Sequence, residues 1–589
     1  MKKQPLLILF LSFILGIFFQ DEFLWSEKQV FSFAGIGFLL GFLILVKNFL
    51  IQKIKVVFVV NLFFSLGMLL HFINSEKPKL PTFQKNEKLI FTLDKKLNST
   101  VKNRRYVIHL QTKFGNFPSV LSVPKELKEL DFSHAYRAEL WINIPQKPNN
   151  NFQFDYPKYL ARQNIYFRSY LPKSYEIADR KSLNFNEKIK QNRLILLHKI
   201  NKSELSTKTQ NFLKGIILAD RTEMDEITVQ DFNKSGLVHF LAISGTHIVI
   251  IFWLIMLVLG FLFPVRFRKM SIVFSLFLIW FFAMYIGFGS SVVRSCLMIS
   301  VYYMYVLLQR KPDLLHSLSL SGIIILFINT NELFDIGFQL SFLAVFGIFW
   351  LNQPILNLFP KPKNKLQKIG LSTISISTSA QLATLPLVLF YFHQSSWMSI
   401  PANLVIIPFS EIIIIFSLLM TFFLHFEVQI KFIFEIYDSV TKFLLEIIHW
   451  FAEQNYAFEK MIPMNIFEVL LCFGIVFSLR FLLKKFNFKI LFYVFLLISG
   501  FLFLRYFFNL NESRKNEILI TNYFKDSIII EKKQTEINFY FDEKTDAITI
   551  KKNIVEPYLT SRRTKSYKII LLKTEQLKAG IENVKLKNH

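Results

Sequence analysis

The sequence has few residues of the kinds that build disulfide frameworks and metal centres. Its 589 residues include only two cysteines, Cys296 and Cys472, and both lie inside apolar runs. This distribution excludes a disulfide framework and a cysteine metal cluster. The eleven histidines are dispersed, and the nearest pair is His239 and His247, which excludes a local motif such as H-E-x-x-H. We therefore expect no metal ion and no cofactor.

Two further signatures are missing. No G-x-x-x-x-G-K-[ST] loop occurs, so the chain should not hydrolyse nucleotides itself. The opening MKKQPLLILFLSFILGIFF has the form of a secretory signal peptide, but no A-x-A-like cleavage site follows it. We interpret this segment as a retained membrane anchor, and we predict that the protein is not an enzyme.

Apolar residues dominate instead. The chain is 52% hydrophobic and contains 69 Phe. Several nearly uncharged runs are long enough to cross about 30 Å of hydrocarbon. They begin at Pro5, Phe31, Val56, Leu237, Ser271, Trp397 and Ile490. The predicted fold class is a polytopic α-helical membrane protein with about 12 to 13 spans.

The net charge of +27 is concentrated in short connectors between these runs. Every second connector is basic, and the basic side of a membrane protein faces the cytoplasm. The connector cations include Lys2, Lys3, Arg266, Arg268, Lys269, Arg310, Lys311, Arg480, Lys484 and Lys485. The pattern places the N-terminus in the cytoplasm, and it places the soluble insert and the C-terminal tail in the periplasm.

Composition divides the chain into four segments. Residues 1–73 form a three-span anchor, 74–185 an extracytoplasmic domain, 186–508 the main membrane domain, and 509–589 a basic tail rich in strand-like runs. The insert has five strand-like runs at 89–93, 105–111, 119–123, 137–144 and 165–171, with a helix-like PKYLARQ before the last. This order predicts a small OB-like β-barrel, although periodicity leaves other small barrels open. Amphipathic helices at 186–234 should lie on the outer membrane surface.

Basic and aromatic residues are interleaved in the insert. OB folds hold single-stranded nucleic acid with this combination of phosphate contacts and stacking platforms. The candidate DNA-binding residues are Arg104, Arg105, Tyr106, Arg137, Trp141, Tyr166 and Arg168. The alternative for each aromatic residue is that it fills the core of a small barrel.

Polar residues within apolar runs are candidates for a translocation pathway. The Ser244-Gly245 pair between His239 and His247 can break a helix, and broken helices in membranes line enclosed or wet paths. Ionisable groups are costly in lipid, so Arg294 and Glu411 join this set, as does Gln339. The alternatives are interhelical packing for the histidines and snorkelling of Arg294 to the interface.

The segment from Glu427 to Trp450 carries charged residues at three- and four-residue spacing, including Glu435 and Asp438. Such residues form one stripe along a helix. We favour a crossing helix whose stripe faces a polar path. If this helix did not cross, the next basic connector, with Arg480, Lys484 and Lys485, would lie outside the cytoplasm, against the charge rule. An interfacial helix, preceded by a re-entrant segment broken at Pro408, is the alternative.

Several blocks resemble one family in the same order. GIILADRTEMDEITVQDFNKSGLVHFLAISGTHIVII, GSSVVRSCLMIS, FDIGFQLSFLAVFGI and AQLATLPLVLFYFHQSSWMSIPANLVIIP are similar to blocks of the ComEC family of competence proteins, and PNNNFQFDYPKYLARQNIYF resembles its N-terminal domain. The resemblance spans roughly residues 1 to 508. It implies an inner-membrane channel that moves single-stranded DNA into the cytoplasm during natural transformation.

The same resemblance implies partners and one departure. A separate DNA receptor, a cytoplasmic helicase or ATPase, and membrane lipid are the expected partners. Many members end in a β-lactamase-like nuclease domain with a His/Asp metal motif, whereas the only histidine of this tail is His589. We therefore expect a short form that uses a separate nuclease. The alternatives are a transporter of an anionic lipid-linked or small polar solute, and a membrane scaffold whose outer domain binds a protein.

Overall fold

The computed structural model describes residues 4–577 except 47, 77, 79, 82, 84–86, 101, 114, 181, 429, 524 and 525. Lys2, Lys3 and His589 lie outside the described residues. The chain folds into two compact units. Unit 1 comprises Met1–Pro145, Leu160–Phe349 and Met398–Glu453, and unit 2 comprises Gln146–Tyr159, Trp350–Trp397 and Gln454–His589. The four segments expected from composition stay a prediction.

Ten helices in the described part of the chain are long and apolar enough to span a bilayer. They are α1 (Pro5–Phe23), α3 (Phe49–Ser75), α9 (Gly245–Leu262), η2–α10 (Val265–Phe267 and Arg268–Tyr285), α11 (Ser290–Leu307), α13 (Ile336–Leu356), α14 (Lys365–Phe392), α15 (Ser399–His425), α17 (Ile466–Lys484) and α18 (Phe488–Ser513). The expected number was about 12 to 13. The difference arises because α2 (Glu27–Phe42) and α12 (Leu314–Ile328) are shorter and α16 (Lys431–Ala452) is more highly charged.

These helices expose apolar side chains to their surroundings. Only 6% of the most apolar 18-residue stretch of α18 is buried inside the protein, and the side chains of Phe495 and Phe503 are more than half exposed. A water-soluble protein rarely exposes a continuous apolar surface of this kind. The helices therefore belong to a multi-pass membrane protein.

Helices α1 and α3 approach each other closely through two glycines. A Cβ on Gly16 would lie 2.0 Å from the carbonyl oxygen of Phe64, and a Cβ on Gly67 would lie 2.3 Å from that of Phe13. Small residues permit this backbone contact between membrane helices. Helices α1 and α3 are thus packed directly against each other.

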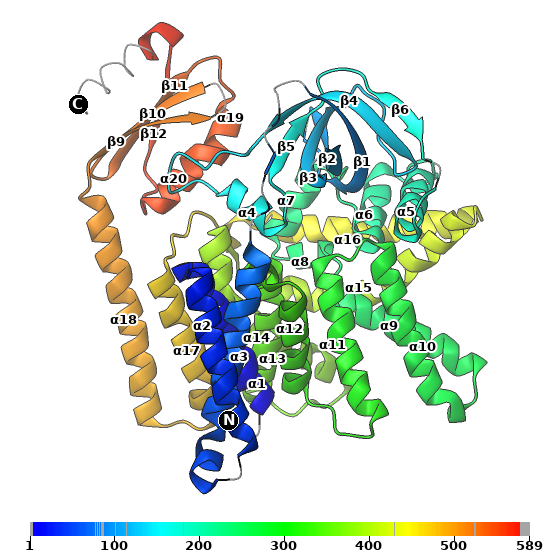
Figure 1. Cartoon of the computed structure of the whole chain (residues 1–589), viewed down its shortest axis with the longest axis vertical. Coiled ribbons are helices and arrows are strands. Elements are labelled where there is room, and N and C mark those ends of the chain that lie inside the picture. Colours follow the sequence, from blue (N-terminus) through cyan, green and yellow to red (C-terminus); the bar gives the residue numbers. More distant parts are fainter. Residues whose placement is uncertain are drawn as a thin grey trace. The chain divides into compact units, whose positions relative to one another are not determined.

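The soluble insert forms one six-stranded sheet in unit 1 (Figure 1). Its strands are β1 (Glu87–Leu97), β2 (Asn103–Thr112), β3 (Gly115–Pro124), β4 (His134–Asn143), β5 (Phe167–Tyr170) and β6 (Glu176–Asp179), and α4 (Tyr156–Arg162) precedes β5. The order is β1-β2-β3-β5-β4-β6, and β1 also pairs with β4. The five predicted strands and the predicted helix are confirmed. The predicted closed barrel is not confirmed, and β6 was missed because all four of its residues are exposed and show no alternation.

Short amphipathic helices follow the sheet, as expected. They are α5 (Phe185–Asn201), α6 (Thr207–Leu218), α7 (Glu226–Lys234) and α8 (Val238–Leu241). Asn184 and Asp225 cap α5 and α7 through hydrogen bonds to backbone N–H groups. The apolar faces of α5 and α6 enter one core with α15 and α16.

The C-terminal part of unit 2 is a folded domain. Strands β9 (Glu517–Tyr523), β10 (Asp526–Lys533), β11 (Glu536–Asp542) and β12 (Lys568–Leu572) form a sheet in the order β12-β11-β10-β9, with α19 (Ala547–Ile550), η5 (Lys551–Val555) and α20 (Glu556–Ser561) before β12. The strand-like runs expected in the tail are confirmed as β9 to β12. Phe152 packs against this domain's core, with its ring 5.3 Å from that of Tyr558. A two-stranded pair, β7 (Ser395–Ser396) and β8 (Phe458–Glu459), completes unit 2.

Candidate functional site

The helix break expected at Ser244-Gly245 is present. Helix α8 ends at Leu241, and α9 begins after the N-cap residue Ser244. The Nδ1 atom of His247 accepts a hydrogen bond from the backbone N–H of Ser244 (3.1 Å) and lies 2.9 Å from its hydroxyl. His247 is 1% exposed, and its Nε2 has no hydrogen-bond partner among the described residues. His239 lies on α8 with an exposed side chain.

A charged cluster lies on α11 (Ser290–Leu307), the helix that contacts this break. A Cβ on Gly245 would lie 3.3 Å from the hydroxyl of Ser295 on α11, and the preceding residue on α11 is Arg294. The Arg294 guanidinium donates to the Ser290 hydroxyl (2.7 Å) and pairs with Asp335 (3.4 Å). Arg294 is only 3% exposed, so this arginine does not snorkel to the interface. The break therefore contacts α11, the helix that also carries the buried arginine.

The acids come from η3 (Thr330–Phe334) and from Asp335, which directly follows it. Glu332 accepts a hydrogen bond from Ser290 (2.9 Å), and Asp335 caps α13 through the N–H of Phe338 (2.8 Å). Gln339 donates to the Leu333 carbonyl (2.9 Å), which ties α13 to η3. The sequence analysis predicted Arg294 and Gln339 as pathway residues but not Ser290 or Glu332. Sequence periodicity does not show that α11 packs against η3.

Three of the predicted pathway residues lie elsewhere. Glu411 is exposed on α15, and Glu435 is exposed on α16, 4.0 Å from Lys431. Asp438 accepts hydrogen bonds from the backbone N–H (3.1 Å) and hydroxyl (2.6 Å) of Ser206, the N-cap of α6, and pairs with Lys442 (2.7 Å). The Arg294 cluster does not include them.

Helix α16 has three distinct faces. Phe434, Tyr437, Thr441, Leu444, Ile448 and Phe451 are buried against the protein. Phe432, Ile436, Phe443 and Trp450 form an exposed apolar face, and Lys431, Glu435, Lys442, Glu446 and His449 form an exposed charged face. A helix that contacts protein, lipid and water along its whole length has the form of an interfacial helix.

The surroundings of α16 agree with this form. The helix runs across the direction of α9 and α11 (Figure 1), and it is not among the ten candidate spans. At the end of α15, Lys199 of the surface helix α5 donates to the His425 carbonyl (2.9 Å) and pairs with Glu427 (2.7 Å). These contacts favour an interfacial α16 over the crossing helix. The re-entrant segment broken at Pro408 that was expected before an interfacial helix is absent, because α15 is one continuous helix through Pro408.

The candidate DNA-binding residues divide into an exposed group and a structural group. Arg137, Trp141 and Arg168 are exposed on β4 and β5, where the Trp141 ring lies 5.6 Å from that of its cross-strand partner Tyr170. Tyr170 was not predicted, because only the strand register places it beside Trp141.

The remaining candidates contribute to the sheet domain itself. Tyr106 is fully buried, so assigning it to base stacking was wrong. Arg104 donates to the carbonyls of Lys125 (3.0 Å) and Leu127 (2.7 Å), and Tyr166 packs partly buried against the core. Arg105 is half-buried on β2. The exposed group therefore lies at the surface of the sheet domain, whereas Tyr106 does not.

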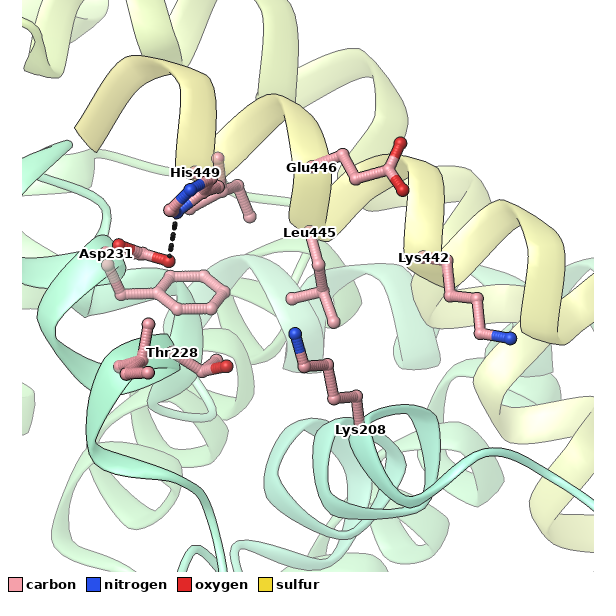
Figure 2. Close-up of a pocket in the computed structure, with 10 residues that line it drawn as sticks. Lys208, Thr228, Asp231, Lys442, Leu445, Glu446 and His449 are labelled. Carbon is pink, nitrogen blue, oxygen red and sulfur yellow. Dashed lines mark hydrogen bonds and ion pairs between the residues drawn. The ribbon is translucent and has the colours of Figure 1, made fainter. Parts of the chain in front are cut away.

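A cavity of about 300 Å³ lies between α6, α7 and α16 (Figure 2). His449 pairs with Asp231 (2.9 Å) at one end, and Lys208 points into the space below α16. Lys442 and Glu446 also line it. Because carboxylates accompany the lysines, the cavity is poorly suited to a polyanion and is left out of the candidate path.

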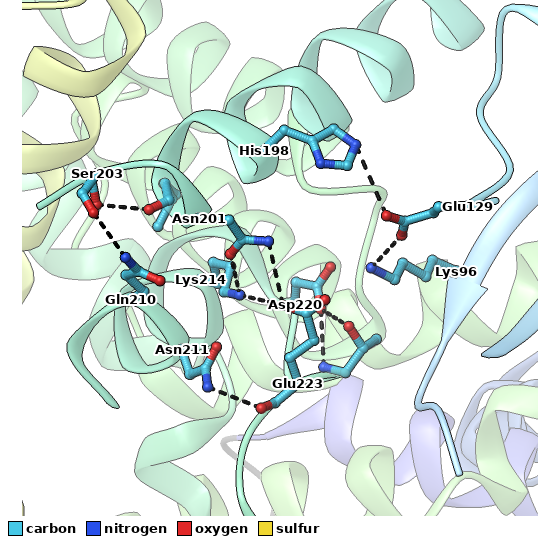
Figure 3. A network of polar contacts seen from close by, with 12 residues as sticks. Lys96, Glu129, His198, Asn201, Ser203, Gln210, Asn211, Lys214, Asp220 and Glu223 are labelled. Carbon is cyan, nitrogen blue, oxygen red and sulfur yellow. Dashed lines mark hydrogen bonds and ion pairs between the residues drawn. The ribbon is translucent and has the colours of Figure 1, made fainter. Parts of the chain in front are cut away.

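A polar network joins the sheet to the surface helices (Figure 3). Lys96 of β1 pairs with Glu129 (2.7 Å), and the buried Lys214 of α6 donates to Asn201 and Glu223, each at 2.6 Å. Burial alone would lower the pKa of Lys96, but Asp220, Glu129 and Glu223 together raise it. Sequence reasoning missed this network, because its partners come from separate segments.

The comparisons with known proteins concern the same region. The family model described as Competence protein matches residues 216–486, which contain the helix break, the Arg294 cluster and α16. ComE operon protein 3 of Bacillus subtilis (strain 168) is 31% identical over 259 residues, covering 44% of this chain and 31% of that protein. Uncharacterized protein MG316 of Mycoplasma genitalium is 28% identical over 226 residues, covering 36% of this chain and 58% of that protein.

The chain therefore aligns with less than two thirds of the length of either relative. No solved structure matches it significantly. The matched residues include the blocks on which the resemblance rested, except the one in the soluble insert. Residues 216–486 are thus a domain that matches the competence-protein family, in agreement with the resemblance to ComEC proteins.

Proposed function

We propose that this protein is a bacterial inner-membrane channel that moves single-stranded DNA from the periplasm to the cytoplasm during natural transformation. The carrying observation is that the family domain contains a helix break at Ser244 and a buried Arg294 cluster on α11, the helix that the break contacts. Broken helices and buried charges in membrane proteins mark pathways for polar cargo.

The sheet of unit 1 is the proposed receiver of the strand. Its strand order and the β1–β4 pairing support an OB-like domain. The exposed Trp141 and the partly exposed Tyr170 supply stacking surfaces, and Arg137 and Arg168 supply cations. Such contacts bind without strong sequence preference, because stacking and phosphate contacts do not read base edges. The chain would act without its own catalysis, together with a separate receptor, a helicase or ATPase, and a nuclease.

The test uses the full chain in proteoliposomes with a labelled single-stranded oligonucleotide outside. We expect saturable, protein-dependent protection of the oligonucleotide from added nuclease. The double variant Trp141→Ala/Tyr170→Ala should weaken binding by about 1 to 3 kcal/mol per lost stacked base, whereas Trp450→Ala, an exposed tryptophan on α16, should not. If about five phosphates are neutralised, raising salt from 50 to 200 mM should reduce affinity about a hundredfold.

Two outcomes contradict the proposal in different ways. Transport of small anionic solutes or lipid-linked sugars without protection of DNA would support the solute transporter instead. Binding of DNA that is insensitive to salt and to the aromatic variants would remove the sheet from its role as receiver.

A further inference from the structure

Segment η3 is held from two sides by arginines of different parts of unit 1. On one side Arg294 pairs with Asp335, which directly follows η3. On the other side the guanidinium carbon of Arg162 lies 3.5 Å from the centre of the Phe334 ring. Arg162 ends α4, shortly before β5, which carries the exposed Arg168. The segment therefore lies between the sheet domain and the polar cluster.

The Arg162 side is anchored by a carboxylate at the end of α1. Arg162 donates to both oxygens of Asp21, at 3.1 and 3.0 Å, and both side chains are mostly buried. His71 on α3, 2% exposed, contacts Asp21 (3.4 Å) and the Thr330 hydroxyl (2.9 Å). An arginine that contacts two carboxylate oxygens and stacks on a ring is fixed in direction as well as position.

The two sides are linked energetically through η3. A 3₁₀ segment of five residues has few and poorly aligned hydrogen bonds of its own, so its side-chain anchors determine where it lies. Arg294 is nearly fully buried and needs the carboxylates of Asp335 and Glu332 nearby. Displacing η3 at Phe334 would therefore remove the counter-charge of Arg294, and displacing Arg294 would loosen η3.

We propose that Arg162 and Asp21 are positioning residues that hold η3 where Asp335 can pair with Arg294, and that they couple the sheet domain to the polar cluster. This inference rests on the proposed function for its transport readout. Neither residue needs to contact DNA. They act through η3, whose position depends both on the Arg162–Asp21 pair and on Arg294.

The test is a double-mutant cycle on DNA transport with the full chain. Asp21→Asn and Arg294→Gln are measured singly and together, and Asp21→Glu serves as the conservative variant. We expect Asp21→Asn to add little once Arg294 is changed, so that the double variant transports at least about fivefold more than the product of the single effects. Asp21→Glu should restore much of the activity. Asp21→Asn combined with Lys442→Gln on α16 should give the simple product, because Lys442 contacts Asp438 and not η3.

A second measurement does not depend on transport. In a chain with Cys296 and Cys472 replaced, Ser290→Cys reports on the contact between α11 and η3, because Ser290 bonds Glu332 and Arg294. Adding Asp21→Asn should raise the rate of thiol modification at position 290 at least about fivefold. Multiplicative effects in the cycle together with an unchanged modification rate would overturn the inference. Failure of the wild-type chain to transport DNA would instead overturn the proposed function and leave the thiol measurement to decide the coupling.

Discussion

The contacts of Asp438 give this predicted pathway residue a structural role. Burial alone would raise the pKa of its carboxyl, but hydrogen bonds from Lys442, Ser206 and Thr209 lower it to about 2. A lowered pKa means that the ionised carboxylate stabilises the fold. This stabilisation is fully present above the unfolded pKa near 3.8 and is lost as pH falls through the folded value.

We therefore predict that Asp438→Asn lowers the melting temperature of the purified protein by about 2 °C or more, because it weakens charge-assisted bonds to the start of α6. Glu435→Gln is the matched control. Glu435 is exposed, and its ion pair with Lys431 is long at 4.0 Å, so Glu435→Gln should leave the melting temperature nearly unchanged. Differential scanning fluorimetry at pH 7 measures both variants. Equal stability of the two variants would mean that the bond to Ser206 contributes nothing.

At the scale of elements, the orientation of α16 can be measured directly. Phe432 and Trp450 lie on its exposed apolar face near opposite ends. An interfacial helix places both at the same depth, whereas a crossing helix separates them by about 27 Å at 1.5 Å per residue. We predict equal quenching by depth-calibrated lipid quenchers for fluorophores attached at Phe432→Cys and Trp450→Cys.

The control for this measurement is α18, a candidate span that exposes Leu491 and Phe507 near its two ends. Fluorophores there should differ in depth by about 24 Å along the helix axis. A large depth difference on α16 would restore the crossing helix and require a new count of the spans that follow.

At the scale of the whole molecule, the basic connectors predict which surfaces face the periplasm. In a chain without its native cysteines, Asn116→Cys and Ser395→Cys should react with an impermeant thiol reagent in intact cells. Lys365→Cys should react only after the membrane is permeabilised. All three positions are at least partly exposed, so a lack of labelling at one of them would reflect sidedness. A reversed pattern would discard the orientation and with it the inward direction of transport.

The sequence by itself determined the elements that depend on local pattern. Apolar runs predicted spanning helices such as α1, α3 and α15, strand-like runs predicted five strands of the sheet and the strands of the tail, and Ser244-Gly245 predicted a helix break. These features follow from hydrophobic burial and backbone geometry, which repeat along the chain.

The tertiary structure alone decided which polar residues meet. Arg294 finds Asp335 and Arg162 finds Asp21 across large separations in sequence, and the pairing of Trp141 with Tyr170 follows from strand register. It also assigned Tyr106 to the core and divided the faces of α16 among protein, an apolar exposed surface and a charged surface. A one-dimensional pattern specifies which face of an element is apolar, but burial and charge pairing depend on the neighbours that packing brings to that face.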